Sequence, residues 1–201
     1  MKVFIFGVSQ LILRWVFRAL FRIKVEGRDD VPRHGKLLLA ANHVVAIDPL
    51  LIASFAPRQL HFLGKREIFG MPVLGRLAKF FNCIPIDRAD VSPSTLKTIG
   101  EIFERGGGLL LFPEGTRTKD GAIAPFKAGI GLIAARNEVG IVPVCTSGLF
   151  QAKSRWWRRP RIVLRFGQVI PVKQYLDGGA KKAIYAAIAS ELAARMRQLA
   201  G

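Results

Sequence analysis

The chain has 201 residues, of which 50% are hydrophobic and 22% are charged, with 31 Lys and Arg against 14 Asp and Glu. The resulting net charge of +17 favours an anionic partner: nucleic acid, an anionic membrane face or a phosphorylated substrate. A mean hydropathy of +0.27 excludes a disordered polycation, and the length fits one domain with one sizeable core. The high hydrophobicity favours a membrane or lipid among the three partners.

The few cysteines and histidines exclude several kinds of site. Cys83 and Cys145 lack a Cys-x-x-Cys spacing, which indicates a reducing compartment and not a disulfide framework. No pair among His34, His43 and His61 has the spacing of zinc ligands, so we expect no metal site. The chain also lacks the glycine-rich loops that bind nucleotide phosphates, so nucleotide-driven chemistry has no support.

The N-terminal segment is apolar and then basic. Residues 3–13 carry no charge, but a bilayer span needs about 20 such residues. Arg14, Arg18 and Arg22 follow at intervals of four, so a helix would carry them in one stripe. We expect residues 1–24 to form an amphipathic helix in the membrane interface, with its arginines meeting lipid phosphates. A secretory signal, a buried helix of a soluble domain and a full transmembrane span remain as alternatives.

The remaining chain, residues 25–201, is predicted to form one α/β domain without an internal boundary. Expected strands cover residues 36–42, 59–65, 82–88, 109–113, 141–148 and 161–170, the last with the alternation of an edge strand. Expected helices cover residues 49–57, 72–81, 93–105, 128–137 and 179–199. Strands that alternate with helices predict a single layered domain, in which helices flank a mostly parallel mixed sheet.

A histidine and an aspartate flank the turn after the first of these strands. In the stretch NHVVAID, His43 ends the strand and Asp48 begins the next helix. Ligands of α/β sheets collect at the carboxyl ends of strands. A turn between the two residues would bring the carboxylate to one imidazole nitrogen and leave the other nitrogen as a base. The spacing alone also fits a helix-capping aspartate beside an incidental histidine.

Polar and cationic residues follow three further strands, where a planar guanidinium, an ammonium, a hydroxyl and backbone N–H groups can surround a phosphate. The predicted phosphate-binding residues are Lys65, Arg88, Glu114, Gly115, Thr116 and Arg117. Because a second negative charge is unfavourable beside a phosphate, we expect Glu114 to orient Arg117 or a substrate hydroxyl. Taken one at a time, each of these residues could also be a solvated surface side chain.

Together these motifs resemble those of the glycerolipid acyltransferase family, in the same order along the chain. The matching blocks are NHVVAID, GKREIF, IPIDR, FPEGTRT, FKAG and IVPV, within residues 35–170. Two positions depart from the family pattern. Val45 stands where the family often has Ser or Thr, and Asn82 stands where it commonly has Gly.

The resemblance implies acyl transfer from an acyl-CoA or acyl carrier protein thioester to the free hydroxyl of 1-acyl-sn-glycerol-3-phosphate, giving phosphatidic acid for phospholipid biosynthesis. His43 would remove the hydroxyl proton while Asp48 holds the imidazole, and the acceptor hydroxyl would be the nucleophile. The thioester is then a co-substrate, and we expect no bound cofactor. The implied partners are a lysophospholipid, an acyl donor (including acyl carrier protein) and an anionic membrane surface at the cytoplasmic face, without nucleic acid.

Other functions fit parts of the sequence. The acceptor could be another lyso-lipid, such as lyso-ornithine lipid or lysophosphatidylethanolamine. A cysteine nucleophile, Cys83 or Cys145, would instead form an acyl-enzyme with His43 as base. The stretch RWWRRPR at residues 155–161 suits a membrane interface, a nucleic-acid patch or a solvated loop. A non-catalytic lipid-binding protein and a basic nucleic-acid-binding domain also remain.

Overall fold

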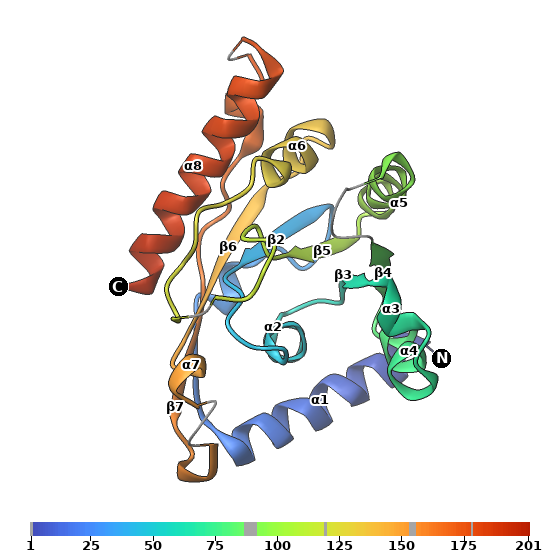
Figure 1. Ribbon diagram of the computed structural model, residues 1–201, viewed down its shortest axis with the longest axis vertical. Coiled ribbons are helices and arrows are strands. Elements are labelled where there is room, and N and C mark those ends of the chain that lie inside the picture. Colours follow the sequence, from blue (N-terminus) through green and yellow to red (C-terminus); the bar gives the residue numbers. More distant parts are fainter. Residues whose placement is uncertain (1, 87–91, 119, 153–155, 178) are drawn as a thin grey trace.

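The computed structural model describes residues 2–86, 92–118, 120–152, 156–177 and 179–201, and it shows one seven-stranded sheet with helices on both faces (Figure 1). This confirms the predicted α/β class. The strands are β1 (Arg22–Glu26), β2 (Leu37–Ala41), β3 (Leu60–Lys65), β4 (Cys83–Ile86), β5 (Gly108–Leu111), β6 (Ile141–Ser147) and β7 (Arg161–Phe166). The helices are α1 (Lys2–Leu20), α2 (Asp48–Phe55), α3 (Arg66–Phe69), α4 (Pro72–Phe80), α5 (Pro93–Glu104), α6 (Gly129–Arg136), α7 (Leu149–Ala152) and α8 (Lys181–Ala200). Short 3-10 turns are η1 (Arg28–Asp30), η2 (Trp156–Arg158) and η3 (Val172–Tyr175).

The strand order places several loops of interest at one edge of the sheet. The order is β1-β7-β6-β2-β5-β3-β4, and every pairing is parallel except that of β6 with β7. The neighbours β2, β5, β3 and β4 therefore all run in the same direction. Their carboxyl ends lie along one edge, which is where α/β sheets bind ligands.

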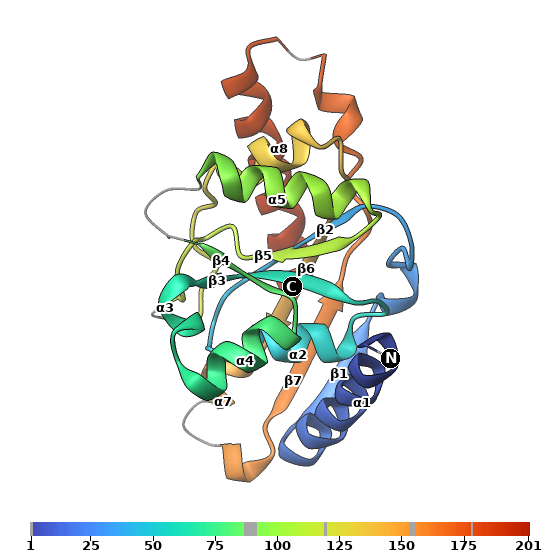
Figure 2. The ribbon, with the colours of Figure 1, turned by 90° about the vertical axis from the view of Figure 1, so that its right-hand side faces the viewer.

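The core has two halves, one on each face of the sheet, because side chains alternate along a strand. Leu37 and Leu39 of β2 pack with residues of α1 and α2, whereas Leu38 packs with residues of α5, α6 and α8. Figure 2 shows the same division, with α1, α2 and α4 below the sheet and α5, α6 and α8 above it. Burial of each leucine contributes about 1.5–3 kcal/mol to stability, so the continuous apolar run of β2 is fixed in the centre.

Local sequence signals set several boundaries as expected. At the start of α5, the Ser92 hydroxyl accepts the N–H of Thr95 at 3.2 Å, and Pro93 occupies the first helical position.

Just before β4, Asn82 has a φ of 55°. Asparagine is among the residues best tolerated in this left-handed region. It can therefore adopt the backbone conformation at this position, where the family commonly has glycine.

The prediction of residues 161–170 as an edge strand is wrong. Strand β7 pairs with β1 on one side and with β6 on the other, so the edge strands are β1 and β4. The alternation in β7 has a different cause: Ile162, Leu164 and Phe166 are buried, while the residues between them are partly exposed. A strand with one covered face and one more open face has the same alternation of apolar and polar residues as an edge strand.

Helix α1 confirms the predicted N-terminal helix over Lys2–Leu20, but Arg22 and residues 23–24, which we expected to continue it, belong to strand β1 instead. The polar stripe of α1 points toward the end of α2, because the Gln10 side-chain amide donates to Ala53 O at 2.6 Å and Arg14 Nε donates to Ser54 O. Its outward face is apolar, and Trp15 is 68% exposed. Among the described residues, no helix combines the length and the hydropathy needed to cross a bilayer.

Candidate active site

The loop between β2 and α2 holds the predicted histidine and aspartate together. His43 Nδ1 lies 2.9 Å from Asp48 Oδ2, and both side chains are nearly or fully buried. The same oxygen accepts the backbone N–H of Val44 at 2.5 Å and that of Val45 at 2.8 Å. These three contacts close the loop around the carboxylate, which also lies at the N-terminus of α2, where a negative charge is favourable.

This geometry fixes the protonation pattern of the imidazole. Since a carboxylate only accepts hydrogen bonds, the proton of neutral His43 belongs on Nδ1. The lone pair is then on Nε2, which can accept a proton from a substrate. When it does so, the buried Asp48 carboxylate stabilises the positive charge of the imidazolium.

The loop after β5 also holds His43, through hydrogen bonds to its backbone and a ring contact. Glu114 Oε1 accepts the His43 backbone N–H at 3.1 Å, and the Thr118 N–H donates to His43 O at 2.8 Å. The Phe112 ring stacks on the imidazole with centroids 4.2 Å apart. The backbone and the ring of the histidine are therefore both held by residues from a segment distant in sequence.

The Glu114 carboxyl group is buried in this arrangement. Burial raises its pKa, an effect partly offset by hydrogen bonds from the backbone N–H groups of His43 and Ala124. Within the described part of the chain, no hydrogen bond or ion pair joins Glu114 to Arg117, and Glu114 Oε2 is buried without a hydrogen-bond partner. This carboxylate is thus held by backbone N–H groups, including that of the histidine.

The other predicted phosphate-binding residues lie at the same edge of the sheet. Lys65 ends β3, while Thr116 and Arg117 follow β5; all three are exposed. Arg88 lies outside the described residues. Strands β2, β5 and β3 are adjacent, so Lys65 and Arg117 both come from strand ends beside that of His43.

The turn at Gly115 brings in a cation that we did not predict. Gly115 has a φ of 72°, and a methyl group at this position would lie only 3.0 Å from Lys127 Nζ. The Lys127 N–H donates to Pro113 O at 3.0 Å, which ties the FKAG segment to the loop after β5. The FKAG block contains Lys127 and was its signal in the sequence. The spacing of the motifs does not indicate that the Lys127 ammonium lies over Gly115.

A cavity of about 600 Å³ opens beside the histidine loop. One wall is formed by residues 44–47, and the loop at residues 116–118 adds polar groups. The rest of the lining is apolar and includes Phe21, Leu149 and Trp156. The site thus combines a histidine held by an aspartate, exposed cations and a mixed polar and apolar cavity.

The two cysteines lack the properties of a nucleophile. Burial raises the pKa of the Cys83 thiol to about 11, and it also raises the pKa of Cys145. A thiol must ionise to attack a thioester, so both groups are poorly suited to covalent catalysis near neutral pH. Among the described residues, no three His, Cys, Asp or Glu side chains gather as metal ligands.

Comparison with known proteins assigns the family. The acyltransferase family model matches residues 22–147. The 1-acyl-sn-glycerol-3-phosphate acyltransferase of Bacillus subtilis is 25% identical over 178 residues, covering 88% of this chain and 87% of that protein. That of Cocos nucifera is 31% identical over 162 residues, covering 79% and 50%, and the chloroplastic LPAT1 of Arabidopsis thaliana is 30% identical over 131 residues, covering 64% and 36%.

The chain spans about a third to a half of the length of these plant relatives. A solved structure shares the fold: the crystal structure of the 1-acyl-sn-glycerophosphate (LPA) acyltransferase PlsC from Thermotoga maritima. It aligns with a TM-score of 0.77 at 20% identity, covering 98% of this chain and 81% of that one. The chain belongs to the acyltransferase family.

Proposed function

We propose that the protein transfers a fatty acyl group from an acyl-CoA or acyl carrier protein thioester to the free hydroxyl of 1-acyl-sn-glycerol-3-phosphate, giving phosphatidic acid. The observation that carries this proposal is the buried pair of His43 Nδ1 and Asp48 Oδ2, 2.9 Å apart. The relatives from Bacillus subtilis and Cocos nucifera, both named 1-acyl-sn-glycerol-3-phosphate acyltransferases, support the choice of acceptor.

The reaction needs one base and no covalent intermediate. His43 Nε2 accepts the proton of the acceptor hydroxyl while its oxygen attacks the thioester carbonyl carbon. When the tetrahedral intermediate collapses, the carbon–sulfur bond breaks, and the leaving thiolate takes the proton from His43. Asp48 stabilises the imidazolium between these steps, a contribution of general acid–base catalysis that is about 10²–10⁴-fold in rate.

The exposed cations beside His43 are proposed to hold the phosphate of the acceptor. Lys65 and Arg117 supply charged donors, and Thr116 supplies a hydroxyl. Arg88 is proposed for the same role from its position in the IPIDR block. Binding the phosphate at a fixed distance from Nε2 would align the hydroxyl with the thioester.

The cavity of about 600 Å³ is proposed to take the hydrocarbon part of the substrates. Its apolar lining, which includes Val44, Leu149 and Trp156, begins beside the histidine loop. A lipid whose hydroxyl reaches His43 has to place its chain close by, and an apolar wall there avoids the cost of exposing that chain to water.

Membrane attachment at the cytoplasmic face is proposed from the exposed apolar surface of α1 and α4. The outward residues on α1 include Leu11, Ile12 and Trp15, and those on α4 include Val73 and Leu77. The two helices meet where the Phe6 and Phe81 rings lie 6.1 Å apart, and both lie below the sheet in Figure 2. Apolar side chains gathered in this way beside arginines are typical of interfacial binding, and the free cysteines fit a reducing compartment.

The test is a panel of acceptors and donors given to purified protein in nanodiscs. Lysophosphatidic acid, lysophosphatidylethanolamine and lyso-ornithine lipid are each offered with acyl-CoA and, separately, with acyl-loaded carrier protein, and the products are identified by mass spectrometry. His43→Ala removes the base. His34→Ala is the matched control, because His34 is exposed in a loop outside the proposed site.

We expect phosphatidic acid from the wild type and from His34→Ala, and a rate near background from His43→Ala. Product from lysophosphatidylethanolamine or the ornithine lipid instead would keep the mechanism and replace the acceptor. Absence of any product with every donor and acceptor, from protein shown to be folded, would contradict the proposed reaction.

A further inference from the structure

Three arginines surround a second cavity, of about 230 Å³, at the carboxyl end of α2. Arg14 and Arg18 come from α1, and Arg28 comes from η1. Apolar side chains, among them Leu11, Trp15 and Phe55, complete the lining. We call this space the arginine cavity.

The arginines are held in place by the end of α2. Arg14 Nε donates to Ser54 O, and Arg28 Nε donates to Phe55 O at 2.8 Å. Arg18 lies over the Phe55 ring, with Cζ 5.7 Å from the ring centroid. Backbone carbonyls at a helix end need such donors, which explains why arginines are present here. Each guanidinium has further N–H groups, however, so these contacts do not use its full capacity to donate.

Among the described residues, no acidic side chain lines the cavity to balance the charges of the three arginines. Burial lowers the pKa of Arg14, and the positive charges of Arg28 and Arg18 lower it further, because like charges lie close together. Arg28 forms an ion pair with Asp29, whose Oδ1 is 3.7 Å from Arg28 Nη1 and equally far from Arg33 Nη2. Asp29 is 87% exposed and does not line the cavity, so an anion within the cavity would relieve the repulsion.

The cavity adjoins the surface that we propose to face the membrane. Trp15 and Leu11 line it and are also 68% and 54% exposed on the outer side of α1. Tryptophan and arginine side by side are typical of the headgroup level of a bilayer. An anion that arrives with an attached hydrocarbon chain therefore has both a cationic and an apolar contact here.

The arginine cavity is separate from the candidate active site. Asp48 begins α2, whereas the carbonyls of Ser54 and Phe55 at its other end meet the arginines. Eight helical residues place these ends about 10 Å apart, so a phosphate bound by the arginines does not reach His43.

We propose that the arginine cavity is a non-catalytic site for the phosphate of an anionic bilayer phospholipid. Occupation of this site fixes α1 against the headgroups while its apolar face enters the acyl region. The site goes beyond the acyl-transfer proposal, because it binds a lipid that is not consumed and its occupancy is measured without turnover.

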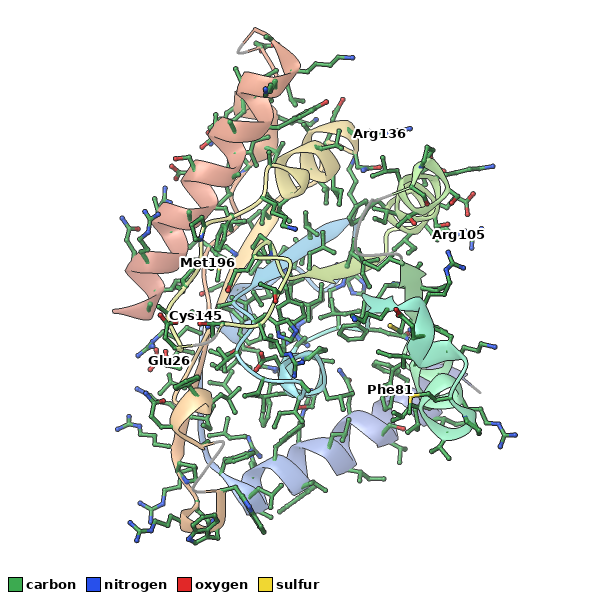
Figure 3. The ribbon with its side chains drawn as sticks, in the orientation of Figure 1. Glu26, Phe81, Arg105, Arg136, Cys145 and Met196 are labelled. Atoms are coloured by element: carbon green, nitrogen blue, oxygen red, sulfur yellow. The ribbon has the colours of Figure 1, made fainter. Side chains whose placement is uncertain are left out.

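The first experiment measures binding to vesicles of phosphatidylcholine alone and of phosphatidylcholine mixed with phosphatidylglycerol. Arg18→Gln removes one guanidinium without breaking a hydrogen bond to the α2 carbonyls. Arg136→Gln is the matched control, since it removes one exposed charge from the end of α6, far from α1 in Figure 3. We expect Arg18→Gln to weaken binding to the mixed vesicles about fivefold and the control to change it much less. Equal losses for the two variants would show diffuse attraction and overturn the site.

The second experiment reports on the cavity itself. In a Trp156→Phe/Trp157→Phe background, Trp15 is the remaining tryptophan, and it lines the cavity. Short-chain phosphatidylglycerol, added as monomers, should shift the Trp15 fluorescence, whereas short-chain phosphatidylcholine and inorganic phosphate should not. The Arg18→Gln variant in this background should not show the shift. A full response to inorganic phosphate would identify a free-phosphate site instead. No response to phosphatidylglycerol would also refute the proposal.

Turnover of a water-soluble, short-chain substrate pair separates this inference from the proposed function. Arg18→Gln should retain the wild-type rate there, because the arginine cavity lies at the far end of α2 from His43. A large loss of that rate would assign the cavity to the catalytic centre and overturn its non-catalytic role. If the wild type has no acyl-transfer activity, the proposed function fails while the two binding experiments still decide this inference.

Discussion

Replacement of Asp48 tests the link between the buried carboxylate, the fold and catalysis. Asp48 Oδ2 accepts three N–H groups, from His43 Nδ1, Val44 and Val45. Asp48→Ala leaves all three donors without this acceptor, at about 1–3 kcal/mol each, or about 3–9 kcal/mol together. That loss rivals the whole free energy of unfolding of a typical domain, about 5–15 kcal/mol. Asp48→Asn keeps one oxygen for the backbone donors, so its cost should be about 1–3 kcal/mol.

The two variants should therefore separate stability from activity. Asp48→Asn should fold yet lose about 10²–10⁴-fold in kcat, because a neutral amide does not stabilise the imidazolium. Urea unfolding measures the first effect, and the initial rate of acyl transfer at saturating substrate measures the second. Asp177→Asn, at an exposed aspartate outside the site, is the control. A folded Asp48→Asn variant with the wild-type kcat would refute the role given to the carboxylate.

Three further results are expected. Because burial raises the Glu114 pKa, its protonated carboxyl group contributes fully to stability at acidic pH, and this contribution is lost as the pH rises through the raised pKa. In urea unfolding, the free energy of unfolding of Glu114→Gln relative to that of the wild type should therefore be higher at pH 7 than at pH 4. Cys83→Ser should keep kcat within about twofold, since a thiol with a pKa of about 11 is only about one part in 10⁴ ionised at pH 7; a large loss of rate would revive the covalent route. Gly131→Ala should lower stability by about 1–3 kcal/mol, because its methyl group would lie 2.2 Å from Tyr185 O where α6 packs on α8; an unchanged Tm would contradict this packing.

The sequence was most informative where burial and local chemistry agree. The uninterrupted apolar runs of β2 and β5 predicted buried strands, because only strands covered on both faces are apolar at every position. The NHVVAID stretch predicted that Asp48 could reach His43, and the turn between β2 and α2 achieves this with two additional backbone donors.

Contacts between distant segments were not predictable in the same way. The Glu114 carboxylate was expected to orient Arg117 or a substrate hydroxyl, and its contact with the His43 N–H, set by the pairing of β2 with β5, was not predicted. Arg14 was expected to meet lipid phosphates, but its hydrogen bond from Nε to Ser54 O at the end of α2 was not predicted. Charge and periodicity indicate that an arginine needs a partner, but the arrangement of the helices decides which partner it finds.

The most direct test of the account is the initial rate of phosphatidic acid formation from lysophosphatidic acid and a labelled acyl thioester, measured for wild type and for His43→Gln. Glutamine keeps a polar side chain of similar length but has no basic nitrogen. We predict steady product formation by the wild type and a rate at least about 10²-fold lower for the folded variant. Equal rates would contradict the claim that His43, held by Asp48, removes the proton of the acceptor hydroxyl.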